Sequence, residues 1–290
     1  MVGFGRLPLR LSFSSAVGVA SLLLGGVANA GFVDLDLNFG GEPGFVTGID
    51  GANIVGVDMF NGREFGFLDS NGNMSYIDAP NDQNVTLFGH VSGGRIAGGT
   101  GSGAGFVYDI ANRSFTSIND PLGYRGTQAV DVSGQDVVGN YWGVGAYGDT
   151  VEHEFLYNGA QYITVDDPLG VGSTTIQAID GNNVLGTYRA GSGSHAFLYD
   201  ITKPADAAAS YTTLSIPVPS NANNVWVTDI SGNDVVGYYD FHNVAGGQGF
   251  IYDIGSGGFT TLDDPLGTYT APAAISDGNI VGTYTSRGAK

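Results

Sequence analysis

Acidic turns recur along this chain and offer oxygen ligands for a cation. They read Asp78, Asn119-Asp120-Pro121, Asp166-Asp167-Pro168 and Asp263-Asp264-Pro265. Hard cations such as Ca²⁺ take several oxygen ligands from clustered carboxylates and carbonyls. A ring of these turns could therefore collect Ca²⁺ or bind a cationic or carbohydrate ligand, and no other cofactor is indicated.

Turn chemistry alone also explains these residues. An aspartate before proline initiates a turn, proline fixes φ, and the final glycine of Asp263-Asp264-Pro265-Leu266-Gly267 permits the chain to reverse. Both interpretations stay open at this point, and the turn interpretation is the simpler one.

Aromatic and basic residues on variable loops form a second group of candidates, because flat exposed rings suit contacts with sugars or proteins. These candidates are Trp142, Tyr188, Arg189, Tyr238, Tyr239 and His242. Another set of phenylalanines occupies one position in successive copies of a repeat and is expected to pack in the core. This set comprises Phe67, Phe106, Phe155, Phe197 and Phe250.

Catalytic motifs are not found in the sequence. The four histidines fall in different repeats without metal-ligand spacing, and there is no nucleophile elbow, Walker loop or dinucleotide fingerprint. No catalytic residue is therefore assigned. The alternative is a carbohydrate-active hydrolase with an acidic pair, for which an acid could come from Glu42, Glu64, Glu152 or Glu154. An enzyme should gather carboxylates in one pocket and break the repeat symmetry, whereas a binding ring should keep equivalent acids in several repeats.

A repeat of roughly 45 residues must position all of these groups. Each copy contains an Ile/Val-x-Gly triplet, and the triplet glycines are Gly56, Gly98, Gly139, Gly186, Gly237 and Gly282. A fixed period of that size indicates an array of supersecondary units, none of which can bury its apolar face alone.

Four short apolar segments in each copy predict four β-strands. Val, Ile, Tyr, Phe and Thr favour strands, and turns such as Asp180-Gly181-Asn182 favour tight hairpins. Beyond the first 30 residues, no stretch has convincing helical periodicity. The sequence therefore predicts an all-β β-propeller of four-stranded blades. A β-solenoid would have a shorter period, and a sandwich would need no self-similarity.

The fourth copy contains His195-Ala196-Phe197-Leu198-Tyr199-Asp200, and the chain resembles the bacterial HAF-type extracellular repeat family over nearly all of residues 43–285. The resemblance implies a repeat-built, exported β-protein without a defined activity. The histidine position varies among the copies, so a shared chemical role for the imidazole is not expected. Its occupants are Phe65, Ala104, His153, His195 and Gln248.

Five full copies span residues 43–79, 84–120, 126–167, 174–217 and 223–264. A partial copy at 270–285 and an N-terminal strand at 31–39 are expected to close a sixth blade, which removes exposed sheet edges. This blade would lack its third strand. Either the N-terminal strand pairs directly with the second strand, or the sequence is truncated; a five-bladed ring is the alternative.

Loops and blade connections share one face of such a ring. In a four-stranded meander, the loop between the second and third strands emerges beside the connection to the next blade, and we name this side the linker face. The acidic turns and the aromatic candidates are expected there. Because rigid frames commonly carry binding sites on such loops, a site is expected on the linker face or in the adjoining channel mouth.

The first 30 residues have the pattern of a secretory signal peptide. Arg6 and Arg10 precede an apolar run, and Ala28-Asn29-Ala30 has the small-x-small form of a cleavage site. Residues 31–290 are then expected to form a single domain without a membrane span. The predicted location is the periplasm, the cell surface or the extracellular space.

Charge and cysteine content exclude several functions. Removing Arg6 and Arg10 with the signal leaves eight of the ten basic residues against 28 acidic ones, and such a polyanion is repelled by nucleic acid and by anionic lipid. There is no cysteine, so neither a disulfide framework nor a thiol nucleophile is available. The sequence therefore predicts a secreted, monomeric, non-catalytic binding module, whose ligand is a carbohydrate, a protein or Ca²⁺.

Overall fold

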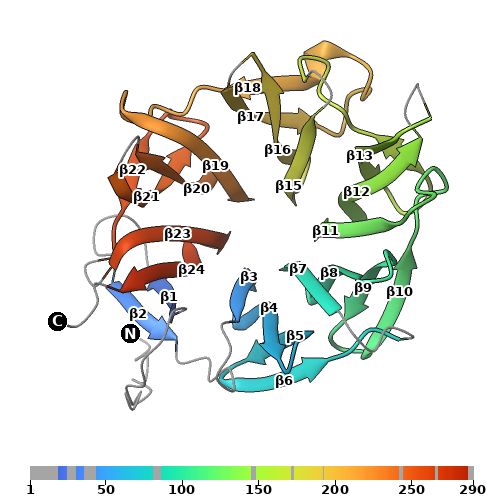
Figure 1. The fold of residues 1–290 in the computed structure, drawn as a ribbon, viewed down its shortest axis with the longest axis horizontal. Coiled ribbons are helices and arrows are strands. Elements are labelled where there is room, and N and C mark those ends of the chain that lie inside the picture. The colour runs from blue at the N-terminus through green and yellow to red at the C-terminus, as the bar shows by residue number, and fades with distance from the viewer. Residues whose placement is uncertain are drawn as a thin grey trace, which may run out of the picture.

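The computed structural model describes residues 19–24, 31–35, 44–80, 86–144, 148–170, 173–191, 193–241, 244–264 and 267–286. Its strands are arranged radially around a central axis (Figure 1). Besides one 3₁₀ turn, η1 (Ala208–Ser210), the described elements are β-strands. The predicted all-β propeller with four-stranded blades is confirmed. Within the described ranges, no helix is long and apolar enough to cross a membrane.

Four blades are separate antiparallel sheets of four consecutive strands. Blade 1 comprises β3 (Phe45–Asp50), β4 (Asn53–Phe60), β5 (Arg63–Ser70) and β6 (Asn73–Ile77). Blade 2 comprises β7 (Thr86–Ser92), β8 (Arg95–Thr100), β9 (Gly105–Asp109) and β10 (Ser114–Ile118). Blade 3 comprises β11 (Thr127–Ser133), β12 (Asp136–Val144), β13 (Thr150–Tyr157) and β14 (Tyr162–Thr164). Blade 4 comprises β15 (Thr174–Asp180), β16 (Asn183–Ala190), β17 (Gly193–Asp200) and β18 (Tyr211–Leu214).

The fifth sheet is eight-stranded, so the described strands form five hydrogen-bonded sheets. This matches the five-blade alternative and corrects the six-bladed ring with an incomplete last blade that the sequence favoured, because the partial copy joins the sheet of the fifth copy. It holds two antiparallel quadruplets joined by one parallel pair, Gly247 with Tyr269. The fifth quadruplet comprises β19 (Ala222–Ser231), β20 (Asp234–Phe241), β21 (Val244–Asp253) and β22 (Phe259–Leu262). The closing quadruplet comprises β23 (Gly267–Ser276), β24 (Asn279–Ser286), β1 (Val19–Leu24) and β2 (Gly31–Leu35).

β1 corrects one predicted way of closing the ring. Direct pairing of the N-terminal strand with the second strand of the partial copy was one expectation, but β1 lies between β24 and β2 and pairs with both. β1 was not expected, because its apolar residues also fit an export signal. The signal itself stays a prediction, and its residues 1–18 and 25–30 lie outside the described part of the chain.

A close approach between two strands explains the Ile/Val-x-Gly triplet. Each triplet glycine lies in the second strand of its quadruplet, opposite a register shift in the first strand. A Cβ added to any of the six would lie 2.0–2.8 Å from a carbonyl oxygen of that first strand; on Gly139, the distance to the Gln128 oxygen is 2.0 Å. Glycine is required here, because the carbonyl belongs to a packed sheet and cannot move aside.

The phenylalanine of the third strand packs against the same glycine. The rings of Phe67, Phe106, Phe197 and Phe250 would lie 2.6–2.8 Å from the added Cβ. The five phenylalanines predicted to be core residues are each at most 4% exposed, which confirms that prediction. Glycine and ring therefore form one packing unit that recurs around the propeller.

Replacing Phe197 by alanine should test this packing. Phe197 is 0% exposed, and deleting a buried aromatic side chain costs about 3–5 kcal/mol of unfolding free energy. Phe60 provides a matched control, because it is 50% exposed and its replacement should cost less than about 0.5 kcal/mol. Urea denaturation measures both variants. Equal losses in the two would contradict the proposed packing.

Candidate functional site

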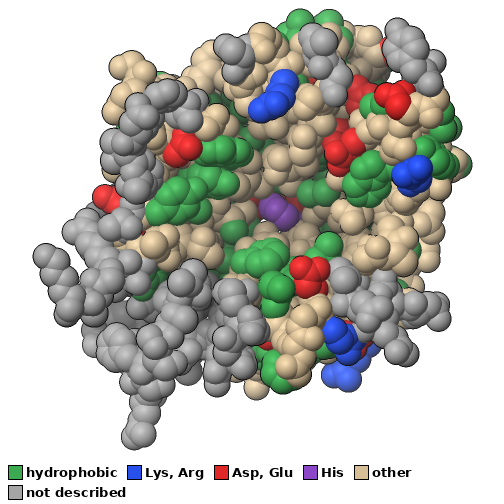
Figure 2. All heavy atoms as spheres, in the orientation of Figure 1, with side chains coloured by type: hydrophobic (Ala, Val, Ile, Leu, Met, Phe, Trp, Pro, Cys, Tyr) green, Lys and Arg blue, Asp and Glu red, His purple; other side chains and the backbone are tan. Residues whose placement is uncertain are grey.

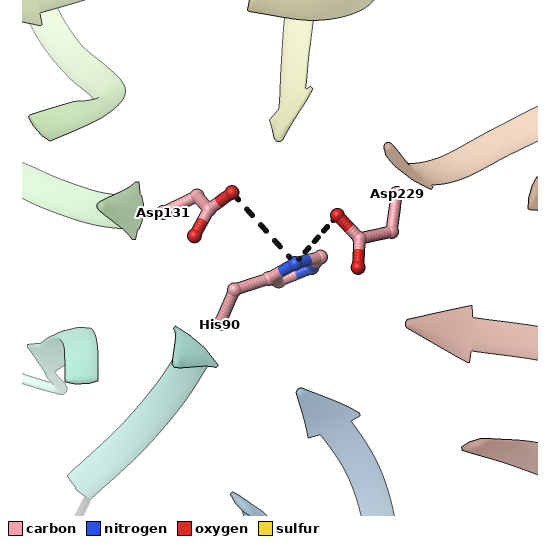
Figure 3. Close-up of side chains that lie close together, drawn as sticks. All are labelled: His90, Asp131 and Asp229. Atoms are coloured by element: carbon pink, nitrogen blue, oxygen red, sulfur yellow. Dashed lines mark ion pairs between the residues drawn. The ribbon is translucent and has the colours of Figure 1, made fainter. Parts of the chain in front are cut away.

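Three ionisable side chains meet at the centre of the ring, and the sequence analysis did not connect them. They are His90 of β7, Asp131 of β11 and Asp229 of β19 (Figure 3). The His90 Nδ1 atom lies 3.3 Å from Asp229 Oδ1 and 3.9 Å from Asp131 Oδ2. One ligand atom from each residue can be chosen so that all lie within 4.8 Å of one another. We name these three residues the axial cluster.

The register shift in each first strand positions these side chains. Asp131 and Asp229 lie just after the shift and His90 lies within it, and each comes just before the first hairpin turn of its quadruplet. The equivalent positions in the other three quadruplets hold Gly48, Ala178 and Ala274. A sequence signal for the cluster was therefore present. Three of the six aligned positions hold a polar residue, and the other three hold glycine or alanine.

An open space lies beside the cluster. A cavity of about 70 Å³ is lined by the axial cluster and by residues of the first hairpins, including Asp50, Asp180 and Ser231. Figure 2 shows a histidine side chain in the hollowed centre of one face of the ring. The cavity lies at the end of the channel that carries the first hairpin turns, whereas the sequence analysis expected a site at the linker face.

Backbone N–H groups orient both carboxylates. Asp131 accepts hydrogen bonds from its neighbour Val132 (2.7 Å) and from Ile179 of blade 4 (2.7 Å). Asp229 accepts equivalent bonds from Ile230 (2.8 Å) and from Ile275 of the closing quadruplet (2.7 Å). Each aspartate therefore fixes its own carboxylate and also ties its quadruplet to the next one.

Burial and charge shift the pKa values within the cluster. Burial would lower the pKa of His90, but the nearby carboxylates of Asp229 and Asp131 outweigh it and raise that pKa to about 9. Burial raises the pKa of Asp131 to about 7, with the imidazole of His90 opposing the rise and Asp229 adding to it. Two carboxylates share one imidazole, so negative charge is in excess, and a buried uncompensated charge is costly.

The cluster breaks the repeat symmetry with converging carboxylates, which is the pattern expected of an enzyme, but its size does not suit a sugar. Small-molecule sites typically enclose about 300–1,000 Å³, against about 70 Å³ here. One water needs roughly 10–15 Å³ of such volume. The space therefore suits an ion with a few water molecules.

The aspartate directly before the proline serves the turn in three of the acidic turns. Asp120, Asp167 and Asp264 are at most 5% exposed. Their N–H groups donate to the hydroxyls of Thr127 (3.0 Å), Thr174 (2.9 Å) and Thr270 (2.9 Å), respectively. The Oδ1 atoms of Asp120 and Asp167 each accept the N–H of the leucine two residues later, at 2.8 Å. These contacts match the turn interpretation.

The other predicted acids are exposed: Asp78, Asp166 and Asp263. Asp78 lies 3.9 Å from the Arg63 guanidinium. Asp166 lies 2.8 Å from Nδ1 of His153, which stacks on Tyr141. Within the described ranges, the acidic turns do not bring three potential metal ligands together.

The predicted aromatic residues have varied positions. Tyr188 and Tyr239 are buried; Tyr188 stacks on His195 at 5.2 Å, and the Tyr239 hydroxyl donates to Gln248 at 2.7 Å. Tyr238 is half-buried and stacks on Trp226, Trp142 is half-buried, and Arg189 is exposed. His242 lies outside the described residues. In blade 4 and in the fifth quadruplet, the residue before the repeated alanine or glycine of the third strand is His195 or Gln248. Each of these side chains contacts a tyrosine of the second strand.

Comparisons with known proteins identify the fold and no more. The structure is similar to TolB from Acinetobacter baumannii, with a TM-score of 0.56 and 15% identity over 86% of this chain and 64% of that one. For a protein assigned as TolB from Agrobacterium tumefaciens, the TM-score is 0.60 and the identity is 12%, over 92% of this chain and 98% of that one. The β-propeller domain of the Trilobed protease from Pyrococcus furiosus has an open velcro topology. Its TM-score is 0.57 and its identity is 9%, over 89% of this chain and 80% of that one.

The chain is a β-propeller. At these identities the similarity supports the architecture alone. No protein-family model matches the sequence, and no curated protein matches it.

Glu154 of β13 is a further buried acid that the sequence analysis considered for catalysis. It is 0% exposed, and its Oε2 accepts the N–H of Ile176 in blade 4 at 3.0 Å. Burial raises its pKa well above the ordinary value of 4.5, and the charges of Glu152 and Asp166 add to the rise. The protonated form is therefore favoured in the folded protein, and stability is lost as pH rises from the unfolded pKa towards the folded one.

Glu154→Gln should remove this pH dependence. Glutamine keeps an acceptor for the Ile176 N–H but carries no charge, so the variant should melt at a higher temperature than the native chain, by a margin that grows from pH 4 to pH 8. Thermal unfolding followed by circular dichroism measures the margin. Glu152→Gln, at an exposed neighbour, is the control and should show a smaller change. A margin for Glu154→Gln that stays constant with pH would disprove the assignment.

Proposed function

We propose that this chain is an exported, non-catalytic binding propeller that docks a protein partner on its linker face. The resemblance to the HAF-type extracellular repeats and the secretory pattern of the first 30 residues support export to the periplasm, the cell surface or the extracellular space. The excess of acidic residues favours a partner with a basic contact surface.

Two exposed leucines, each held by the same kind of turn, carry this proposal. Leu122 and Leu169 follow the proline in successive acidic turns and are 61% and 58% exposed. Each is held in place by its own N–H, which donates to the buried aspartate of the turn. A turn whose backbone is fixed before binding loses little backbone conformational entropy when a partner covers it. Tyr124, which is 52% exposed, extends the apolar surface beside Leu122.

The leucines should therefore dominate the affinity. Replacing both by aspartate, as Leu122→Asp with Leu169→Asp, removes two apolar anchors at about 1–2 kcal/mol each and should weaken partner binding at least tenfold. The measurement is quantitative capture from extracellular and periplasmic fractions by the immobilised chain, followed by titration of the captured protein.

A matched control places the same added charge on the opposite face. Ala111→Asp with Asn182→Asp alters two exposed turn residues there and should bind as the native chain does. Retention of the partner by the leucine variant would overturn the proposal, as would binding of the native chain to glycans on an array without any protein partner.

A further inference from the structure

The axial cluster combines ligand types that metal sites use. It presents one imidazole and two carboxylates from three different quadruplets, and their side chains are 13%, 5% and 8% exposed for His90, Asp131 and Asp229. Around an ion bound at about 2.0–2.2 Å in tetrahedral geometry, ligand atoms lie about 3.4 Å apart. The separations of 3.3 and 3.9 Å between His90 and the carboxylates are already close to that value.

The surroundings provide the support that a metal site needs. Backbone N–H groups fix the orientation of both carboxylates, and such outer contacts are what hold ligands in place around metals. Every carboxylate oxygen can accept more than one contact, so these bonds leave lone pairs for an ion. The cavity of about 70 Å³ opens on the cluster, with space for an ion and water ligands.

The charge balance favours a cation. Two carboxylates and one imidazole carry at least one net negative charge when both acids are ionised, and Asp50 and Asp180 line the same cavity. A divalent ion would neutralise this charge among side chains that are at most 13% exposed. The imidazole selects among cations, because Ca²⁺ and Mg²⁺ prefer oxygen ligands alone, whereas Zn²⁺, Co²⁺ and Ni²⁺ accept nitrogen readily.

We propose that His90, Asp131 and Asp229 form a binding site for one divalent transition-metal ion of the Zn²⁺ and Co²⁺ class, at the channel end that carries the first hairpin turns. This site is separate from the linker face, so it does not depend on the docking proposal. Bound there, the ion would join blade 2, blade 3 and the fifth quadruplet across the axis.

Metal titration of the full chain tests the site. After dialysis against chelator, Zn²⁺ should bind with a stoichiometry of one in calorimetry, and Co²⁺ should give the visible absorption bands of a site with low coordination number. Zn²⁺ should also raise the thermal unfolding temperature, because a ligand bound only by the folded state stabilises it. Ca²⁺ at the same concentration should have a much smaller effect.

Variants distinguish this site from binding elsewhere. His90→Gln should weaken Zn²⁺ binding at least tenfold, and so should Asp229→Asn, which retains an acceptor for backbone N–H groups. His153→Gln removes the more exposed histidine that pairs with Asp166 and should leave the affinity unchanged. Because His90→Gln and Asp229→Asn change different ligands and neither opens a large cavity, one of them remains informative if the other does not fold. Binding of Zn²⁺ by native and His90→Gln chains with equal affinity would overturn the proposal, as would no binding or a preference for Ca²⁺.

Discussion

The contact between a triplet glycine and the carbonyl of the neighbouring first strand is the constraint on which the rest of this structure depends. It lets the second strand approach the first where the first strand shifts register. The phenylalanine of the third strand then closes over the glycine. The close approach of glycine and carbonyl recurs in all six quadruplets, and the ring contact is found at Gly56, Gly98, Gly186 and Gly237.

The two ends of the ring use this frame differently. At the linker face, buried aspartates and threonine hydroxyls fix the turns and hold leucines in solvent. At the other end, the residues at the register shift converge. Three of the six are small, and the other three, His90, Asp131 and Asp229, form a charged cluster in a cavity. Asp131 and Asp229 accept hydrogen bonds from backbone N–H groups of the next quadruplet, which makes the cluster part of the closure of the ring. The frame therefore carries exposed leucines and a small polar cavity at opposite ends.

The strands, the hairpins and the phenylalanine core could be predicted from the sequence, because they depend on local patterns that repeat. The role of the acidic turns was partly predictable, because Asp167 before Pro168 is typical of a turn. The contact of Asp167 with Thr174 was not, because Thr174 belongs to the next blade. The axial cluster could not be found by spacing. His90 and Asp229 are far apart in the chain and approach each other only because the ring closes. β1 was missed because its apolar residues fit an export signal as well as a strand.

Unfolding free energies of six single Gly→Ala variants at the triplet positions would test this account most directly. Alanine normally stabilises a strand by about 0.5–1 kcal/mol relative to glycine. With a carbonyl oxygen 2.0–2.8 Å from the added Cβ, we predict the opposite sign at every position, a loss of about 1–3 kcal/mol from overpacking. A gain in stability at these positions would contradict the account.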